Sequence, residues 1–371
     1  PRPEIVMIQR PIGPVAVFGA SNFPLAFSTA GGDTAAALAA GCPVVVKGHS
    51  AHPGTGEIVA EAVKAAIEKT GMPKGTFSLI QGGNRSVGEA LVQHPHIKAV
   101  GFTGGLGGGR ALFDLCAARP VPIPFFGELG SVNPMFVLPH AVANRAVALG
   151  QGWSGSLTMG AGQFCTNPGI AVVIDGADAD RFVGATRAAL EKVPAQTMLT
   201  DGIAAAYRAG QERFATRNSI RPVLVTESEG RSASPNLFET TGAQFLRDHT
   251  MGEEVFGPLG LVVRVGSLGE MRALALGLEG QLTTTLHMDD ADLDAARSLM
   301  PILERKAGRV LVNGFPTGVE VVDSMVHGGP YPASTNFGAT SVGTLSIRRF
   351  LRPVAYQNVP AALLPEPVEA R

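Results

Sequence analysis

The feature that most constrains the fold is a series of short apolar runs that alternate with helix-like segments over residues 1–130. Each run holds five or six residues and is typical of a buried strand. The five predicted strands lie at residues 14–18, 43–47, 76–80, 97–102 and 121–126. Strands that alternate with helices in this way indicate an α/β fold, with a doubly wound domain around a parallel sheet.

The segments between these strands carry ordinary helix signals. Residues 55–70 place apolar side chains on one face and end at Gly71, while residues 110–117 follow a glycine-rich turn. Another helix is expected to begin near Pro24 and to run through Ala40, because proline suits the first turn of a helix.

The same pattern divides the chain into three regions. Residues 11–130 are expected to form the first α/β domain, and residues 131–320 repeat the alternation in a second one. Residues 321–371 return from that domain and end as an extended C-terminal arm. A length of 371 residues is sufficient for two domains with full cores.

Polar and glycine residues stand where several of the predicted strands end. They are Asn22, Lys47, Gly82-Gly83, Thr103-Gly104-Gly105 and Glu128. Since ligands of parallel α/β sheets bind outside the carboxyl ends of the strands, these residues are expected on one rim. An amide, an ammonium group, two glycine turns and a carboxylate together indicate a binding site.

A glycine cluster at residues 104–109 follows the fourth strand and opens a helix. Its spacing does not match G-x-G-x-x-G, so the usual dinucleotide fingerprint is absent. One interpretation is a tight strand-to-helix turn, where glycine has no steric cost. The other is a cradle in which backbone N–H groups and the helix dipole accept a pyrophosphate.

Cys165 lies in the middle of a polar, glycine-flanked loop at residues 160–169, directly before an apolar run. A structural cysteine is usually found inside an apolar run, because a free thiol behaves as a small hydrophobe. A nucleophilic cysteine needs access and nearby donors that favour its thiolate. The loop alone is compatible with both interpretations, and the other parts of a catalytic site must decide between them.

Composition argues against several classes of partner. A formal net charge of −1 without runs of like charge argues against nucleic acid and anionic membranes. The longest apolar stretch, residues 35–46, is too short to span a bilayer. Three cysteines without a Cys-x-x-Cys pair predict no disulfide framework and a reducing, cytoplasmic setting. No metal is expected, since the eight histidines show no metal-ligand spacing.

Six motifs, in order along nearly the whole chain, resemble those of the aldehyde dehydrogenase superfamily. They are Asn22-Phe23-Pro24, Lys47, Phe102-Thr103-Gly104, Glu128-Leu129-Gly130, Gly162-Gln163-Phe164-Cys165 and Glu254-Val255-Phe256-Gly257-Pro258. Residues 19–34 and 162–168 are most similar to the 2-oxoglutarate semialdehyde (2,5-dioxopentanoate) dehydrogenases, a branch close to the NADP-dependent fatty aldehyde dehydrogenases. The resemblance implies a Rossmann-like cofactor domain, a second α/β catalytic domain and a C-terminal oligomerisation arm.

The resemblance also implies a reaction. The Cys165 thiolate would attack an aldehyde carbon, while the amide of Asn22 and the backbone N–H of Cys165 hold the oxyanion. Loss of hydride to a nicotinamide leaves a thioester, for whose hydrolysis Glu128 activates water. Taken singly, Glu128 could be a carboxylate that faces water, and Asn22 could cap a helix. All the matched positions together favour the catalytic interpretation.

A further set of residues is assigned to cofactor binding by the same resemblance. They are Phe18, Gly19, Lys47, His49, Ser50, Gly105, Gly109, Glu254 and Phe256. Ser50 stands where many NAD-preferring relatives carry a glutamate that would repel a 2′-phosphate. With Lys47 and His49 nearby, NADP is the expected cofactor and NAD the alternative. Gly105 replaces the usual serine, so one hydroxyl near the pyrophosphate is missing.

The substrate is expected to be 2-oxoglutarate semialdehyde, whose distal carboxylate requires a cation such as Arg119 or Arg309. A long apolar aldehyde is the second candidate substrate. The motifs are also compatible with a non-catalytic nucleotide-binding relative and with a reductase of acyl phosphates or acyl-CoA. Glu128 argues against the reductase, because its reaction needs no hydrolytic water. Relatives begin with an N-terminal segment that is not in this sequence, so the cofactor domain is expected to be N-terminally incomplete. A homodimer or homotetramer is expected through the C-terminal arm.

Overall fold

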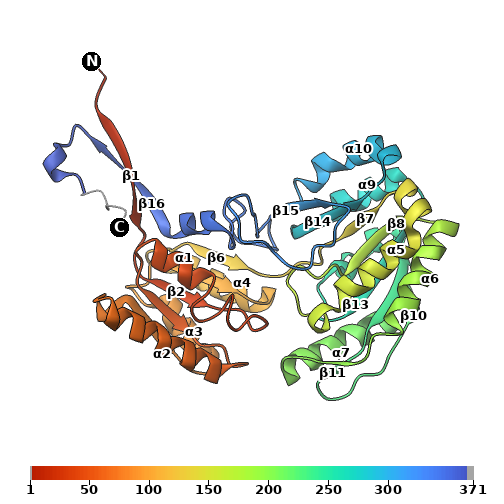
Figure 1. The fold of residues 1–371 in the computed structure, drawn as a ribbon, viewed down its shortest axis with the longest axis horizontal. Coiled ribbons are helices and arrows are strands. Elements are labelled where there is room, and N and C mark those ends of the chain that lie inside the picture. Colours follow the sequence, from red (N-terminus) through yellow and green to blue (C-terminus); the bar gives the residue numbers. More distant parts are fainter. Residues whose placement is uncertain (1, 366–371) are drawn as a thin grey trace.

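The computed structural model describes residues 2–365, which fold into two lobes (Figure 1). The first lobe is built on a five-stranded sheet and the second on a seven-stranded sheet. Helices flank both sheets, which confirms the predicted α/β class. Within the described residues, no helix combines the length and the apolar character that crossing a membrane requires.

The five-stranded sheet is parallel throughout and has the order β4-β3-β2-β5-β6. Its strands are β2 (Val15–Phe18), β3 (Val44–Lys47), β4 (Phe77–Ile80), β5 (Ala99–Thr103) and β6 (Phe125–Glu128). Valine and alanine dominate the central strands because both faces of a parallel sheet are covered. All five strands end at the same edge, where Lys47 closes β3 and Glu128 closes β6.

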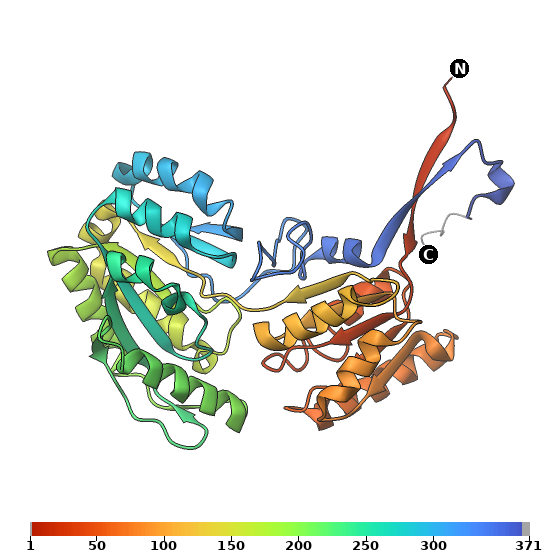
Figure 2. The same ribbon diagram turned by 180° about the vertical axis from the view of Figure 1, so that it is seen from behind.

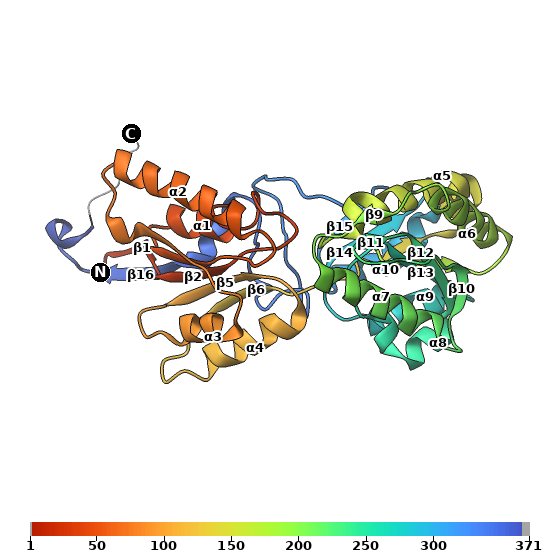
Figure 3. The ribbon, with the colours of Figure 1, turned by 90° about the horizontal axis from the view of Figure 1, so that it is seen from below.

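Helices cover both faces of this sheet, as Figure 3 shows. One face carries α1 (Asp33–Ala39) and α2 (Pro53–Lys69), and the other carries α3 (Arg85–Gln93) and α4 (Leu106–Ala117). Val15 and Val17 belong to the core under the first pair, whereas Ala16 and Phe18 belong to the core under the second. Successive side chains of a strand point to opposite faces, so one short apolar strand serves both cores. The predicted doubly wound arrangement is confirmed.

The prediction of a helix from Pro24 to Ala40 is mostly wrong. It begins only at Asp33, and the preceding residues form turns and bends. Gly32 has a left-handed φ of +50°, and a Cβ on Gly31 would lie 2.0 Å from the carbonyl oxygen of Ala26. The chain therefore folds back on itself here, which a continuous helix could not do.

The fifth strand begins later than predicted. The apolar run starts at residue 121, but β6 covers only Phe125–Glu128. Pro122 and Pro124 carry no backbone N–H, and proline is largely confined to the start of strands or to positions that need no donor.

The seven-stranded sheet has the order β10-β12-β13-β8-β7-β14-β15, with β10 as an antiparallel edge strand. Its strands are β7 (Met135–Val137), β8 (Ile170–Ile174), β10 (Arg221–Leu224), β12 (Asn236–Thr241), β13 (Leu259–Val265), β14 (Gln281–His287) and β15 (Ala307–Val312). A small separate pair joins β9 (Gln196–Thr197) to β11 (Ser232–Ala233). The central strands are buried along nearly their whole length, as expected for a parallel sheet between two helix layers.

Two helix layers enclose this second sheet. On one face, α5 (Pro139–Thr158) packs against α6 (Ala177–Leu190), and Trp153 stacks on Phe182 with ring centroids 5.6 Å apart. The other face carries α7 (Asp201–Ala215), α8 (Gly242–Arg247), α9 (Leu268–Gly277) and α10 (Leu293–Leu303). The loops that precede β8 and β13 hold Cys165 and Glu254, so this lobe contributes its own residues to the site described below.

A two-stranded ribbon extends from the first lobe, as Figures 1 and 2 show. It consists of β1 (Ile5–Pro11) and β16 (Leu351–Gln357), which run antiparallel. The chain reaches β16 from the second lobe through a long irregular segment and a short helix, Thr344–Phe350. A buried ion pair of 2.6 Å between Arg349 and Asp33 holds this return against α1. Within the predicted C-terminal arm, the extended part is Leu351–Gln357, and residues 366–371 lie outside the described residues.

Candidate active site

A cleft of about 720 Å³ opens at the carboxyl ends of the first-lobe strands. It is lined by Phe18, Gly19, Lys47, His49, Gly83, Asn84, Arg85, Gly88, Glu89, Phe102, Thr103, Gly104, Gly105, Gly107, Gly108, Ala111 and Leu112. The prediction that strand-end residues share one rim is confirmed for Lys47, Gly83 and the Thr103-Gly104-Gly105 turn. Ser50 is exposed and does not line the cleft.

The glycine cluster leaves open space at the N-terminus of α4. A Cβ on Gly105, Gly107 or Gly108 would meet no atom within 4 Å, and all three glycines line the cleft. Because α4 begins at Leu106, its first turn presents unpaired backbone N–H groups beside this space. A pyrophosphate fits such a surface, both in shape and in charge.

Gly109, unlike the three glycines just described, has close neighbours. A Cβ there would lie 2.1 Å from Cδ2 of Leu129 and 2.9 Å from the Phe102 ring. This glycine is buried where α4 packs on the sheet, and it does not line the cleft. Its contribution to a cofactor site would therefore be to let α4 pack closely on the sheet.

The cleft carries positive charge mainly through Lys47 and Arg85. Burial lowers the pKa of Lys47, which ends β3. The pKa of His49 is lowered to about 4, first by burial and then by the charges of His52 and Lys47, so its ring is neutral at pH 7. Arg85, the first residue of α3, was missed in the sequence because nothing in its surroundings distinguishes it from other surface arginines.

A second pocket of about 250 Å³ adjoins the cleft and brings the two lobes together. It is lined by Ala20, Ser21, Asn22, Thr103, Gly104, Gly105, Glu128, Gly130, Cys165, Ile203, Glu254 and Phe256. Asn22, Glu128 and Cys165, which are far apart in the sequence, thus face one small space. Glu254 lies beside the turn after β6, since a Cβ on Gly130 would be 2.7 Å from its Oε2 atom.

The loop that carries Cys165 has an unusual backbone. Gly160, Ala161 and Gly162 have left-handed φ angles of +56°, +57° and +67°. A Cβ on Gly162 would lie 2.3 Å from the carbonyl carbon of Gly257. Only glycine permits this approach, so the cysteine loop packs directly on the segment that holds Phe256.

Asn133 fixes the other side of the same loop. Its Nδ2 atom donates to the carbonyl oxygens of Cys165 and Asn167, both at 2.9 Å. Thr283 on β14 donates to Oδ1 of Asn133 at 3.0 Å, and the whole group is buried. A satisfied buried polar network of this kind holds the loop in one conformation.

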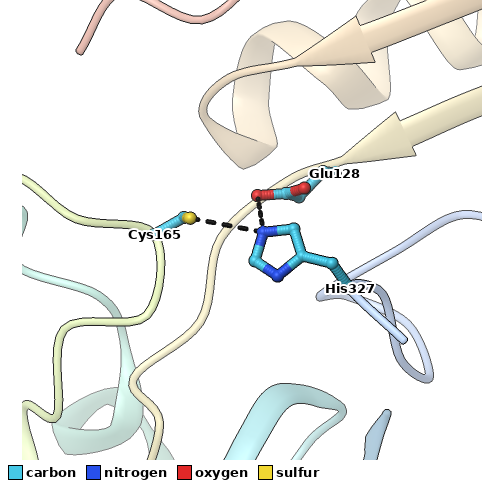
Figure 4. Close-up of side chains that lie close together, drawn as sticks. All are labelled: Glu128, Cys165 and His327. Carbon is cyan, nitrogen blue, oxygen red and sulfur yellow. Dashed lines mark hydrogen bonds and ion pairs between the residues drawn. The ribbon is translucent and has the colours of Figure 1, made fainter. Parts of the chain in front are cut away.

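His327 joins the nucleophile to the carboxylate, as Figure 4 shows. Its Nε2 atom lies 3.4 Å from Sγ of Cys165 and 3.1 Å from Oε1 of Glu128. The other carboxylate oxygen of Glu128 accepts a hydrogen bond of 3.0 Å from Ser341. Glu128 is therefore held at both oxygens by residues from the segment between β15 and β16.

These contacts decide the charges in the site. Burial alone raises the pKa of Glu128, but His327 and Ser341 outweigh it and hold the pKa below its usual value. Burial and the charge of Glu128 raise the pKa of the Cys165 thiol well above its ordinary value. In the ligand-free site the carboxylate is ionised and the sulfur is a thiol, so the sulfur must lose its proton before it attacks.

The sequence profile of the aldehyde dehydrogenase family matches residues 1–342. This chain belongs to the aldehyde dehydrogenase family. It is 54% identical over 368 residues to alpha-ketoglutaric semialdehyde dehydrogenase 2 of Azospirillum brasilense, in a match that covers 99% of this chain and 70% of that protein. It is 47% identical over 374 residues to alpha-ketoglutaric semialdehyde dehydrogenase of Acinetobacter baylyi, with the same coverage of 99% and 70%.

The fold of an aldehyde dehydrogenase is also found by comparison with solved structures. Glyceraldehyde-3-phosphate dehydrogenase GapN of Methanocaldococcus jannaschii, solved with NADP, superimposes with a TM-score of 0.78 at 20% identity. The match covers 96% of this chain and 76% of that one. As a member of this family, the protein is an oxidoreductase that converts aldehydes to acids, and the resemblance seen in the sequence is confirmed.

Asn22 lines the smaller pocket of this aldehyde dehydrogenase together with Cys165. Its Nδ2 atom donates to the carbonyl oxygen of Gln163 at 2.8 Å, which fixes the amide beside the cysteine loop. A second N–H of the same amide remains for a ligand. The backbone N–H of Cys165 has no protein acceptor among residues 2–365, so it is also available.

Three residues of this aldehyde dehydrogenase site escaped the sequence analysis. His327, Ser341 and Asn133 stand in irregular segments without a repeating pattern. His327-Gly328-Gly329-Pro330 is the one local signal, because a histidine before two glycines and a proline is unlike a surface position. Only the fold shows that it reaches Glu128, which is 199 residues earlier in the sequence.

Proposed function

We propose that this aldehyde dehydrogenase oxidises 2-oxoglutarate semialdehyde to 2-oxoglutarate, with NADP as the preferred cofactor. The observation that carries the proposal is the meeting of Cys165, Asn22 and Glu128 in one pocket beside a glycine-lined cleft. The names of the two relatives described above support the substrate, since both are alpha-ketoglutaric semialdehyde dehydrogenases.

The first step is attack on the aldehyde carbon by Cys165. The S–H bond breaks, the sulfur–carbon bond forms, and Glu128 is the nearby anion that can take the proton and release it to solvent before hydrolysis. The developing oxyanion receives hydrogen bonds from the amide of Asn22 and the backbone N–H of Cys165. A donor of this type typically contributes ~3 kcal/mol to transition-state stabilisation.

The last step is hydrolysis of the thioester on Cys165. Glu128 removes a proton from water, which then attacks the acyl carbon and releases the acid and the thiol. The hydrogen bonds of Glu128 to His327 and Ser341 keep it ionised for this purpose. His327 donates through Nε2, so it orients the base and does not compete for the proton.

The cleft is the proposed cofactor site. The glycines at the N-terminus of α4 would receive the pyrophosphate, Lys47 and Glu254 the riboses, and Phe256 the nicotinamide ring. When bound, the nicotinamide supplies the hydride acceptor that turns the first adduct into a thioester. Lys47 and Arg85 favour a 2′-phosphate on the adenosine ribose, because these two cations line the cleft with one carboxylate, that of Glu89.

Arg309 is the proposed partner of the distal carboxylate. It donates through one guanidinium nitrogen to the carbonyl oxygens of Pro316 and Gly318, and the N–H of Gly318 donates to Thr166, next to Cys165. The other candidate, Arg119, donates to the carbonyl of Val92 in the first lobe, between α3 and α4. The surroundings of Arg309 support it as the substrate contact.

We also propose a homodimer or homotetramer that uses the ribbon of β1 and β16. Among residues 2–365 its two strands pair only with each other, and they project from the first lobe. Ile5 and Met7 on β1 are more than half exposed, which is unusual for large apolar side chains on a free ribbon.

The experiment that tests the function compares 2-oxoglutarate semialdehyde with a long apolar aldehyde, each with NADP and with NAD. We expect Cys165-dependent reduction of NADP, with a kcat/KM at least tenfold higher for the semialdehyde. Arg85→Met should lower the kcat/KM for NADP more than the kcat/KM for NAD. Higher efficiency with the apolar aldehyde would contradict the substrate, and undiminished turnover in Cys165→Ala would contradict the mechanism.

A further inference from the structure

Glu128, Cys165 and His327 present three different ligand atoms to one point in the active site (Figure 4). Sγ of Cys165, Nε2 of His327 and a carboxylate oxygen of Glu128 all lie within 4.8 Å of one another. Glu128 and His327 are buried and Cys165 is half-buried. Thiolate, imidazole and carboxylate are the three side-chain ligands that zinc uses in proteins.

We propose that these three side chains bind Zn²⁺, and that the ion inhibits the enzyme by binding the nucleophilic sulfur of Cys165. In tetrahedral zinc sites the bonds of about 2.0–2.3 Å place neighbouring ligand atoms roughly 3.3–3.6 Å apart. The sulfur and Nε2 are separated by 3.4 Å, and Nε2 and the carboxylate oxygen by 3.1 Å. Small side-chain movements therefore complete three corners of a tetrahedron, and the fourth remains for water.

The charge of the site favours a divalent ion with an affinity for sulfur. On binding, the S–H bond of Cys165 breaks, a Zn–S bond forms and the proton leaves to solvent. Two anionic ligands and one neutral imidazole then surround two positive charges, so no uncompensated charge is buried. A sulfur and a nitrogen ligand disfavour Mg²⁺ and Ca²⁺, which prefer oxygen.

One feature of His327 makes this a reversible inhibitory site. With zinc on Nε2 the imidazole proton moves to Nδ1, which is buried and has no hydrogen-bond partner among residues 2–365. Histidine ligands of high-affinity zinc sites usually donate this N–H to an oxygen atom. We therefore expect zinc to be removed by chelators without unfolding the protein.

The test uses Co²⁺ as a spectroscopic substitute for zinc, added to the reduced, chelator-treated full chain without substrate. One equivalent should produce a thiolate-to-cobalt charge-transfer band, and Zn²⁺ should abolish it by displacement. Cys165→Ser should lose the band, and His327→Phe should raise the Co²⁺ concentration for half-saturation at least tenfold. Cys116→Ala and His94→Gln are matched controls, because Cys116 lies in the core and His94 is exposed.

A band that persists in Cys165→Ser, or equal half-saturation in His327→Phe and the parent chain, would overturn the proposal. Circular dichroism and thermal unfolding show that each variant is folded. In the parent enzyme, Zn²⁺ should raise the apparent KM for the aldehyde and leave kcat unchanged. The cobalt titration needs neither substrate nor cofactor, so its failure is distinguishable from a failure of the proposed function.

Discussion

Nε2 of His327 lies 3.1 Å from Oε1 of Glu128, and both side chains are buried. Burial by itself would raise the pKa of this carboxyl and disfavour its ionised form. The hydrogen bonds from His327 and Ser341 act in the opposite direction and keep its pKa below the usual value. The proposed general base is thus kept ionised by two residues from the segment between β15 and β16.

Replacing His327 with phenylalanine should shift the pH dependence of hydrolysis. Without the donor, burial dominates and the pKa of Glu128 rises, so the carboxylate is lost at a higher pH. We expect the acidic limb of the kcat profile to move to higher pH, and kcat at neutral pH to fall at least tenfold. Ser341→Ala should give a smaller shift in the same direction. Profiles that coincide with the parent's in both variants would show that neither residue controls the base.

Glu128→Gln should stop the reaction at the thioester. The amide has a similar shape but cannot accept a proton from water, and general-base catalysis typically contributes 10²–10⁴-fold. Rapid mixing should show a burst of reduced cofactor close to one equivalent per active site, followed by turnover that is slower by about that factor. The burst itself should be slower than in the parent, because Glu128 also takes the proton of the Cys165 thiol. Steady turnover without a burst would mean that hydrolysis uses another base.

Asn22→Ala should lower kcat by about 10²–10³-fold, the range for loss of one oxyanion donor. The affinity for cofactor should change less than kcat, because Asn22 does not line the cleft proposed for the pyrophosphate and the adenosine ribose. Stopped-flow rates of reduction and a fluorescence titration of the cofactor separate the two effects. Since the amide also donates to the carbonyl oxygen of Gln163, Asn22→Gln serves as a second variant that keeps an N–H donor in the side chain.

The sequence predicted those site residues that follow a strand or stand in a family motif. Lys47 and Glu128 end parallel strands, so the topology alone places them on one edge. His327 and Ser341 could not be placed in this way, because they lie in an irregular segment whose path depends on both lobes. The sequence shows no zinc-ligand spacing, because the three ligands come from the distant positions 128, 165 and 327.

The errors in the fold have local physical causes. The apolar and alanine-rich composition of residues 24–40 favours a helix, but Gly31 and Gly32 allow a sharp reversal that ends this preference. The parallel order of the first sheet was predicted correctly, since the alternation of strands with helices leaves few other connections. Helix and strand types were therefore easier to predict than their boundaries.

Gly162→Ala should impair both stability and activity. Its φ of +67° disfavours any side chain, and the new methyl group would lie 2.3 Å from the carbonyl carbon of Gly257. We expect a loss of about 1–3 kcal/mol in the free energy of unfolding and a displaced Cys165. Gly155→Ala is the control, because this exposed helical glycine has no atom within 4 Å of its Cβ position and alanine favours helix. Thermal unfolding and kcat should distinguish the two substitutions clearly.

Arg309→Met should raise the KM for the semialdehyde at least tenfold, because it removes one charge-assisted hydrogen bond of about 1.5–3 kcal/mol. The KM for an uncharged aldehyde should stay within about twofold of the parent's. Arg309 also supports the loop at Pro316 and Gly318, so Arg309→Lys is needed as a variant that keeps the charge. An equal loss with both substrates would assign Arg309 to the loop alone.

The ribbon of β1 and β16 has a consequence for biosynthesis. Ile5 finds its partner only when Gln357, 352 residues later in the chain, has been made. Residues 327–341, which complete the surroundings of Glu128, also emerge late. Such distant pairings form slowly, and an unpaired strand is prone to association while it waits. A nascent chain should therefore depend on chaperones until β16 has left the ribosome, well after both sheets could have folded.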